Sequence, residues 1–241
     1  MARKSPRKRV RRQRGAGWSA RLLGFLVLLG LIGAAWVWWE GQHWRPDESV
    51  WPDQGALIDE ADGPVNFATV KGLGGEFVYL EASRGSDGQD ARFSGNFAAA
   101  QKAELAIGIV HSFDPCALAD EQSANFVTMV PRDAALLPPA IALRDTGEVC
   151  PVRVTRAAIQ SELMTLVNQI EAHAGKPVIL LVSRKFEERY RIASRIERNL
   201  WVSQDWFEPS YAGRPWMLWT ANTSLRTEAA DEPLSWVVVR P

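Results

Sequence analysis

The pattern of apolar and polar positions divides the chain into one long apolar segment and a longer region of short, alternating elements. From Leu22 to Trp39 the sequence LLGFLVLLGLIGAAWVWW runs for 18 residues without a charge. A helix of this length, rising about 1.5 Å per residue, is about 27 Å long and just spans the apolar core of a bilayer. Tryptophans, which favour membrane interfaces, flank the segment at Trp18, Trp36, Trp38 and Trp39. The pattern predicts one transmembrane anchor over residues 22–39.

The charges before this segment indicate its orientation. Nine of the 28 Lys and Arg residues precede Glu40, the first acidic residue. Positive residues stay on the cytoplasmic side, so residues 1–21 are predicted to be a basic cytoplasmic tail of a single-pass protein of the inner (cytoplasmic) membrane. A cleaved signal peptide is the alternative, but its apolar region usually has about 7–15 residues and ends in small ones. Here the segment ends in WVWWE. Beside an apolar helix the basic run indicates topology and anionic-lipid contact, and no nucleic-acid partner is expected.

Beyond the anchor, residues 40–50 lack apolar periodicity and are predicted to form a linker, and a folded domain is predicted over residues 51–241. Short apolar runs in this domain alternate with helical patterns. The runs are Phe77–Ser83, Ala106–Phe113, Pro139–Leu143, Pro177–Ser183, Leu200–Ser203, Trp216–Ala221 and Trp236–Val239. The helical stretches are Phe93–Glu104, Ala117–Val130, Thr155–Ala174 and Phe186–Arg195.

Strands that alternate with helices predict an α/β domain with a parallel sheet. This many candidate strands in roughly 190 residues favour a compact (β/α) barrel, whose working face lies at the carboxyl ends of the strands. The third helical stretch has a candidate N-cap, Thr155, and ends at Gly175.

The only two cysteines, Cys116 and Cys150, each follow a predicted strand and are therefore expected on the rim of that face. Outside the cytoplasm such a pair is expected to form a disulfide rather than free thiols. Closing a loop of about 35 residues would stabilise the domain by roughly 3–4 kcal/mol in the chain-entropy model. Two cysteines and three scattered histidines provide no zinc-like spacing, so no metal or other cofactor is expected.

A family resemblance appears when the strand ends are read together. The stretch Trp51–Phe67, WPDQGALIDEADGPVNF, resembles without a gap the opening YPxxGIDVSxxQGxIDW of glycoside hydrolase family 25, the muramidase lysozymes. Later segments resemble that family's FxFIKATEGxxxxDPRF, GAYHFF, LPPVLDLE, KPxIY and LWQY in the same order, namely Phe77–Phe93, Gly108–Cys116, Leu137–Leu143, Gly175–Leu180 and Trp216–Ala221. The resemblance implies an irregular (β/α) barrel of the family 25 type and a role related to peptidoglycan.

The family's catalytic carboxyl groups are replaced in this chain. Glycosidic cleavage normally needs a pair of carboxyl groups that flank the bond, as proton donor and as base or nucleophile. By the resemblance, the Asp of GIDVS corresponds to Leu57, and the Asp and Glu of DLE correspond to Ala142 and Arg144. The Lys and Glu of IKATEG correspond to Glu81 and Arg84.

Other acids near the strand ends are candidate replacements, of which Asp145, Glu81 and Asp59 are singled out. Acids at barrel rims are more commonly solvated loop residues with no catalytic role. Glu81 is different, because the alternation of its strand points it inward with Tyr79, where an unpaired charge would be costly. An ion pair of Glu81 with Arg144 or Arg84 is therefore expected.

A glycan cleft is predicted at the carboxyl-end face. Trp219 and Tyr79 are candidate sugar-stacking residues because each lies on a strand that leads to this face. His111 is a candidate glycan-binding or catalytic residue, although a lone histidine on a strand is more commonly a satisfied core residue. The predicted cleft consists of Leu57, Tyr79, Glu81, His111, Ala142, Arg144 and Trp219.

Three functions remain open from the sequence. The first is a membrane-anchored lysozyme-like domain that binds peptidoglycan or a related glycan with impaired or lost hydrolysis. The second is an active N-acetylmuramidase that uses relocated carboxylates. The third is an envelope scaffold whose barrel binds a protein partner. The missing acids favour the first over the second.

Overall fold

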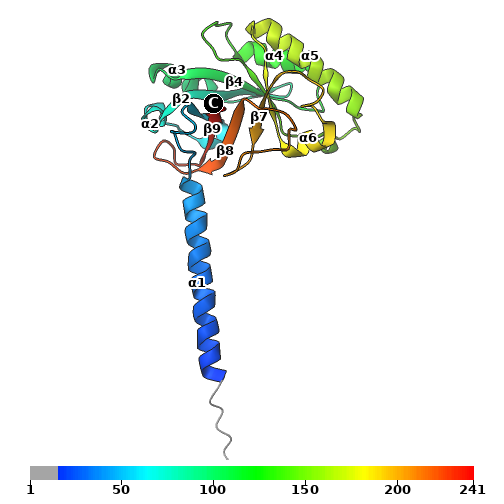
Figure 1. The fold of residues 1–241 in the computed structure, drawn as a ribbon. Coiled ribbons are helices and arrows are strands. Elements are labelled where there is room, and N and C mark those ends of the chain that lie inside the picture. The colour runs from blue at the N-terminus through cyan, green and yellow to red at the C-terminus, as the bar shows by residue number, and fades with distance from the viewer. Residues whose placement is uncertain (1–15) are drawn as a thin grey trace, which may run out of the picture. The chain divides into compact units, whose positions relative to one another are not determined.

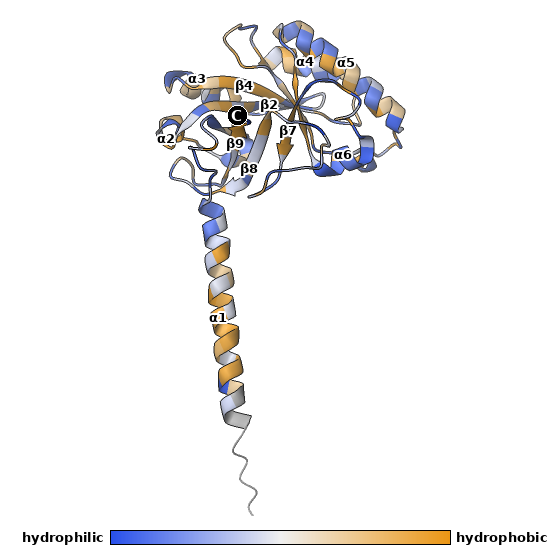
Figure 2. Ribbon diagram, viewed as in Figure 1, coloured by the Kyte–Doolittle hydropathy of each residue, from blue (hydrophilic) through white to orange (hydrophobic). Residues whose placement is uncertain are grey.

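The computed structural model describes residues 16–241; the first 15 residues of the predicted basic tail lie outside this part of the chain. The chain divides into two compact units between Gly41 and Gln42. The first unit contains all but the last two residues of helix α1 (Ala16–His43), whose middle is strongly apolar (Figure 2). The helical segment Ala20–His43 is long and apolar enough to cross a membrane. A signal sequence would have the same property.

In the second unit, eight strands close into a barrel, with helices around them (Figure 1). The ring order is β1-β9-β8-β7-β6-β5-β4-β2, and pairing of β1 with β2 closes it. The strands are β1 (Gln54–Ile58), β2 (Gly75–Arg84), β4 (Ala106–Ser112), β5 (Ala140–Leu143), β6 (Ile179–Val182), β7 (Asn199–Ser203), β8 (Leu218–Leu225) and β9 (Leu234–Val239). A two-residue strand, β3 (Gly88–Gln89), forms a hairpin with the end of β2. The predicted barrel is confirmed.

The helices lie outside the barrel and connect successive strands. They are α2 (Phe67–Gly72), α3 (Phe93–Lys102), α4 (Ala119–Met129), α5 (Arg156–Ala174) and α6 (Arg184–Tyr190), with 3-10 turns at Glu60–Asp62 and Gly147–Val149. The predicted start and end of α5 are confirmed. The Thr155 side chain accepts a hydrogen bond from the Ala158 amide, and Gly175 ends the helix in the left-handed region, with φ 68°.

One strand departs from the expected parallel sheet. Strand β9 runs antiparallel to both of its neighbours, β8 and β1, whereas the other pairs around the ring are parallel. The connection from β8 to β9 is short and contains no helix. A crossover to a parallel strand needs a dozen or more residues, so this short connection returns the chain in the opposite direction. The prediction of an all-parallel sheet is therefore wrong for β9.

Two apolar cores follow from the alternation of side chains along each strand. One set fills the inside of the barrel, where Trp201 is fully buried and its Nε1 donates to Thr220 Oγ1 at 2.8 Å. The other set lies between the barrel and the helices. With both faces of the sheet covered, the strands read as nearly continuous apolar runs.

The segment predicted as a linker packs against the barrel over much of its length. The Arg226 amide donates to the Gln42 carbonyl at 2.7 Å, and Asn222 Nδ2 donates to the Trp44 carbonyl at 2.9 Å. Just after it, the Trp51 ring stacks on Trp216 with centroids 5.8 Å apart. These contacts hold the entering chain along β8.

Candidate functional site

Glu81 lies at the centre of a charged cluster at the carboxyl ends of the barrel strands. Its side chain is only 3% exposed. Oε1 accepts a hydrogen bond from Arg84 Nη2 at 2.6 Å. Oε2 accepts from Arg144 Nη1 at 2.6 Å and from Ser112 Oγ at 2.9 Å. The predicted ion pair is confirmed, with both arginines as partners instead of one.

Three different strands place these partners. Ser112 ends β4 and pairs in register with Ala142 of β5, and Arg144 follows the end of β5 directly. Arg84 ends β2, where Gly85, at φ 54°, turns the chain into the β3 hairpin. Asn125 Nδ2 of α4 donates to the Gly85 carbonyl at 3.1 Å and so holds this turn.

The charges around Glu81 determine its protonation. Burial acts to raise the pKa of this carboxyl, but the charges and hydrogen bonds of Arg144 and Arg84 outweigh it and hold the pKa below the ordinary value. Glu81 is therefore ionised at neutral pH, and both of its oxygens are occupied. A carboxylate in this state is a poor proton donor and a poor nucleophile.

A second group of acids lies beside this cluster. Asp62 Oδ2 accepts a hydrogen bond from the Asp59 amide at 2.7 Å, and Asp59 Oδ1 accepts from the Ala61 amide at 2.8 Å. Burial, together with the nearby charges of Asp59 and Asp90, raises the pKa of Asp62 to about 7. Asp62 thus keeps its proton to a higher pH than an ordinary aspartate does.

The positions that correspond to the family's acids are apolar or basic. Leu57 and Ala142 are both buried in the interior of the barrel. Arg144 is partly exposed and bound to Glu81. Asp145, the residue after it, is exposed, and its charge acts on Arg84. All three candidate acids, Glu81, Asp59 and Asp145, thus act electrostatically on the same arginine.

Tyr79 lies inside the barrel but toward the opposite end from Glu81. Its hydroxyl donates to the Pro138 carbonyl at 3.1 Å, and its ring packs edge-on against Trp201, with centroids 4.9 Å apart. It lines a hollow together with Ala106 and Leu218, which begin β4 and β8. Alternation along β2 points both Tyr79 and Glu81 into the barrel. Glu81 lies two residues further along the strand, so Glu81 faces the carboxyl end of the barrel and Tyr79 faces the opposite end.

Trp219 points outward from β8 and not toward the Glu81 cluster. The centroid of its ring lies 5.5 Å from that of the Trp51 ring and 6.5 Å from that of the Trp44 ring. Its Nε1 donates to the Gln204 carbonyl at 2.8 Å. The indole thus secures the entering chain on the outside of the barrel, and the site described here does not include it.

His111 is fully buried on the outer side of β4. Its Nδ1 lies 2.9 Å from Ser83 Oγ and its Nε2 lies 3.3 Å from Gln122 Oε1. Burial lowers the pKa of the ring to about 4, so the histidine is neutral. This geometry matches the satisfied core residue considered in the sequence analysis.

The predicted disulfide is confirmed. Cys116 and Cys150 are bonded, with their Cα atoms 5.4 Å apart. The bond joins the loop after β4 to the loop after β5. These two loops follow the strands that supply Ser112 and Arg144, so the disulfide restrains two sides of the cluster.

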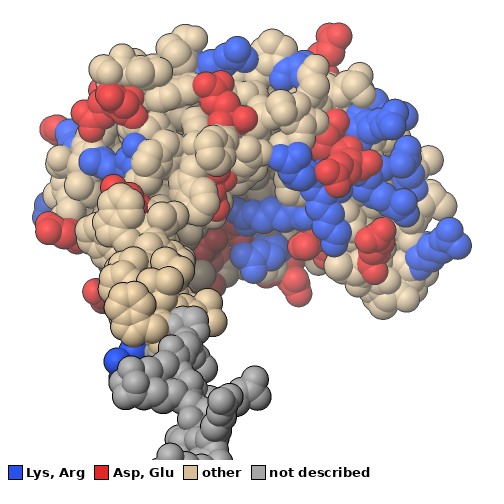
Figure 3. All heavy atoms as spheres, turned by 60° about the horizontal axis from the view of Figure 1, so that its bottom comes forward, with Lys and Arg blue, Asp and Glu red and all other residues tan. Residues whose placement is uncertain are grey.

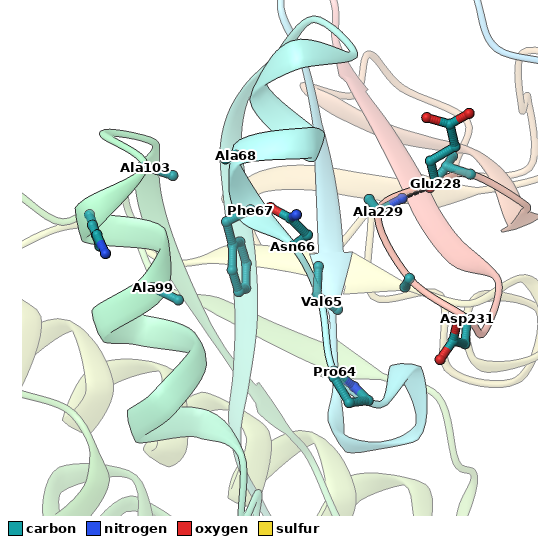
Figure 4. A pocket seen from close by; sticks show the side chains of 13 residues that line it. Pro64, Val65, Asn66, Phe67, Ala68, Ala99, Ala103, Glu228, Ala229 and Asp231 are labelled. Atoms are coloured by element: carbon teal, nitrogen blue, oxygen red, sulfur yellow. Dashed lines mark hydrogen bonds between the residues drawn. The ribbon is translucent and has the colours of Figure 1, made fainter.

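Two hollows differ in their relation to this cluster. One, of about 210 Å³, is lined by Glu60, Glu81, Arg84 and Asp90. In the space-filling view, acidic atoms lie within a hollow and basic side chains gather along one side of it (Figure 3). The other hollow, of about 720 Å³, lies at the side of the barrel between α2, α3 and residues 227–231 (Figure 4). It contains no residue of the Glu81 cluster.

No group of three or more His, Cys, Asp or Glu side chains among residues 16–241 is arranged to hold a metal ion. The acids near Glu81 interact with arginines and backbone amides.

Sequence reasoning did not single out Ser112 or Asp62. Alternation along β4 carried a signal for Ser112, because it lies two residues after the inward-facing Val110. No sequence signal pointed to Asp62, because its raised pKa depends on burial that only the folded chain produces.

Known proteins resemble this chain in sequence and in fold. Lysozyme M1 of Streptomyces globisporus is 32% identical over 73 residues, which are 30% of this chain and 25% of that protein. A family 25 glycosyl hydrolase from Bacillus anthracis superposes with a TM-score of 0.74 at 22% identity, covering 83% of this chain and 93% of that one. A bacterial lysozyme from Streptomyces coelicolor superposes with a TM-score of 0.69 at 18% identity, covering 78% and 92%.

These superpositions establish the fold. Residues 58–224, more than half of the chain, match the sequence profile of glycosyl hydrolases family 25. The chain therefore belongs to glycosyl hydrolases family 25.

Proposed function

We propose that this chain is a membrane-anchored family 25 domain that binds peptidoglycan glycan at the cell wall and does not hydrolyse it. The observation that carries the proposal is the binding of Glu81 between Arg84 and Arg144. Arg144 stands where the family pattern has its Glu, and apolar Leu57 and Ala142 stand where it has its Asp residues. The centre of the site thus contains an ion pair in place of a pair of available acids.

The same ion pair suits a binding site. Arg84 and Arg144 are 65% and 36% exposed, so each guanidinium keeps donors that face solvent. Such donors bind hydroxyl, acetamido and carboxylate oxygens of a glycan, while Glu81 and Ser112 fix their orientation.

The apolar helix supports the membrane part of the proposal. The basic residues before it favour a cytoplasmic amino terminus and a domain outside the cytoplasmic membrane. The disulfide is consistent with that compartment, because disulfides persist in oxidising surroundings.

Sedimentation with insoluble peptidoglycan tests the proposal. The full-length chain in detergent is mixed with purified peptidoglycan, and bound protein and newly released reducing ends are measured in the same tubes. We expect binding without release of reducing ends. Arg144→Met should weaken binding several-fold, whereas Arg132→Met, a matched arginine that contacts His173 away from the cluster, should not.

Each measurement can contradict one half of the proposal. Reducing ends released well above a protein-free blank would show that hydrolysis is retained. Failure of the wild-type chain to sediment would favour the protein scaffold instead.

Hydrolysis by relocated carboxylates is a second candidate, favoured by one observation. The pKa of Asp62 is raised to about 7, which suits a proton donor at neutral pH. If the chain does release reducing ends, Asp62→Asn should abolish the release. Activity that survives Asp62→Asn would reject Asp62 as the donor.

A further inference from the structure

The loop after β7 presents two large apolar side chains at the surface. Trp206 is 48% exposed and Phe207 is 69% exposed. Trp206 also has φ 68°, a left-handed conformation that is unusual for a bulky residue. Exposing this much aromatic surface is unfavourable in water, so the loop has the composition of a contact surface.

The backbone of this loop is fixed to strand β8. The Trp206 amide donates to the Ala221 carbonyl at 2.9 Å. The carboxylate of Asp205 accepts from the Thr223 amide at 2.7 Å and from Thr223 Oγ1 at 3.1 Å. The two aromatic side chains are therefore held at the carboxyl end of β8.

The same end of β8 receives the chain from the apolar helix. Arg226, three residues beyond Thr223, donates its amide to the Gln42 carbonyl. Three residues of extended chain span about 10 Å. Gln42 itself follows the apolar segment 22–39 by only three residues. Connectivity alone thus limits how far the Trp206 loop can lie from a membrane that the helix crosses.

One cationic side chain contacts this loop, and a second follows it in the chain. Arg184 and Lys185 are exposed at the start of α6. Arg184 Nη2 donates to Gln204 Oε1 at 2.5 Å, and its guanidinium lies 4.7 Å from the centre of the Tyr211 ring. These contacts hold the charge of Arg184 at Gln204, which lies two residues before Trp206 in the chain.

We propose that Trp206 and Phe207 insert into the interfacial layer of the bilayer, with Arg184 and Lys185 contacting lipid phosphates. Aromatic residues and adjacent cations are the combination that binds the headgroup region of membranes. The proposal rests on the membrane anchor of the proposed function.

Site-specific labelling of the full chain in lipid nanodiscs tests this contact. The chain's two cysteines are disulfide-bonded, so an introduced cysteine provides a single free thiol for the fluorophore NBD. Labels are placed with Phe207→Cys, with Val127→Cys and with Leu28→Cys. Val127 is a 43% exposed apolar residue of α4, which follows β4, the strand opposite β8 in the ring. Leu28, within the apolar helix, reports insertion of the anchor.

Lipids with a doxyl quencher near the headgroup should reduce the emission of the label at position 207 at least twofold, and should leave the label at position 127 unchanged. Quenching at position 28 without quenching at position 207 would overturn the membrane contact while leaving the anchor intact. Absence of quenching at position 28 would overturn the anchor and the contact together. A label at position 207 that responds only to added peptidoglycan fragments would assign the aromatic pair to glycan and also overturn the proposal.

Discussion

At the scale of single residues, the site depends on one buried carboxylate. Removing a charge from water is unfavourable, and Glu81 is tolerated inside the barrel because two guanidinium groups and a hydroxyl occupy its oxygens. Removing one member of such a cluster costs more folding free energy than the ion pair contributes. The reason is that the remaining charged groups lose their hydrogen-bond partner.

Replacing Glu81 tests this account. Glu81→Gln leaves Arg84 and Arg144 without their carboxylate and should reduce the free energy of unfolding by about 1–3 kcal/mol at pH 7, a range that allows for the partial exposure of both arginines. The pKa of Glu81 is lowered in the folded state, so its contribution is present above the unfolded pKa and is lost as pH falls through the folded one. The stability difference should therefore shrink below about pH 4.

Chemical denaturation at pH 7 and pH 3.5 measures this difference. Glu104→Gln is the matched control, because Glu104 pairs with Lys71 while 85% exposed. A Glu81→Gln difference that stays constant with pH would contradict the ionised pair.

Asp62 should show the opposite dependence on pH. Its pKa is raised to about 7 in the folded state, so its contribution is complete below the unfolded pKa and is lost as pH rises through about 7. Asp62→Asn keeps an acceptor for the Asp59 amide but removes the charge. It should raise the melting temperature at pH 8 and change it little at pH 4. Equal shifts at both pH values would argue against a raised pKa of the Asp62 carboxyl.

At the scale of elements, strand ends and the loops after them create the site. Strands β2, β4 and β5 each contribute one end, and the disulfide ties two of the following loops together. Alternation within each strand decides which side chains face inward, but the loops decide how far the arginines can reach.

Removing the disulfide should loosen these loops. Cys116→Ser together with Cys150→Ser opens a loop closed across a sequence separation of 34 residues and should cost roughly 3–4 kcal/mol of unfolding free energy. Thermal unfolding of the variant beside the oxidised wild type measures the loss. Non-reducing mass spectrometry of protein taken from the cell envelope provides the independent check: two free thiols there would contradict the bond.

At the scale of the whole molecule, the barrel has its own closed core and needs no contribution from the apolar helix. Both apolar cores consist of residues of the second unit. The contact of Gln42 with Arg226 and the stacking of Trp51 on Trp216 also belong to that unit.

Deletion of residues 1–40 should therefore give a soluble, folded barrel with its disulfide formed. Circular dichroism and size-exclusion chromatography would show a cooperative, non-aggregated domain. A further deletion to residue 50 should be less stable, because it removes Trp44 and the Gln42 carbonyl from the end of β8. Aggregation of the first truncation under oxidising conditions would show that the domain begins elsewhere.

The sequence by itself determined the features that depend only on residues close together in the chain. The 18-residue apolar run, the alternation of strands and helices, the caps of α5 and the order of the family segments are properties of neighbouring residues. The loss of acids at positions 57, 142 and 144 is equally a matter of sequence. Even the ion pair of Glu81 was predictable, because an inward acid needs a partner.

Only the tertiary structure decided which side and which end of the barrel each residue occupies. Tyr79 and Trp219 both lie on strands that lead to the site, yet Tyr79 faces the opposite end and Trp219 packs outside. The raised pKa of Asp62 likewise depends on burial in the folded chain. The periodicity of a strand specifies two faces, but closure of the barrel determines which is the interior, and burial depends on residues far away in the chain.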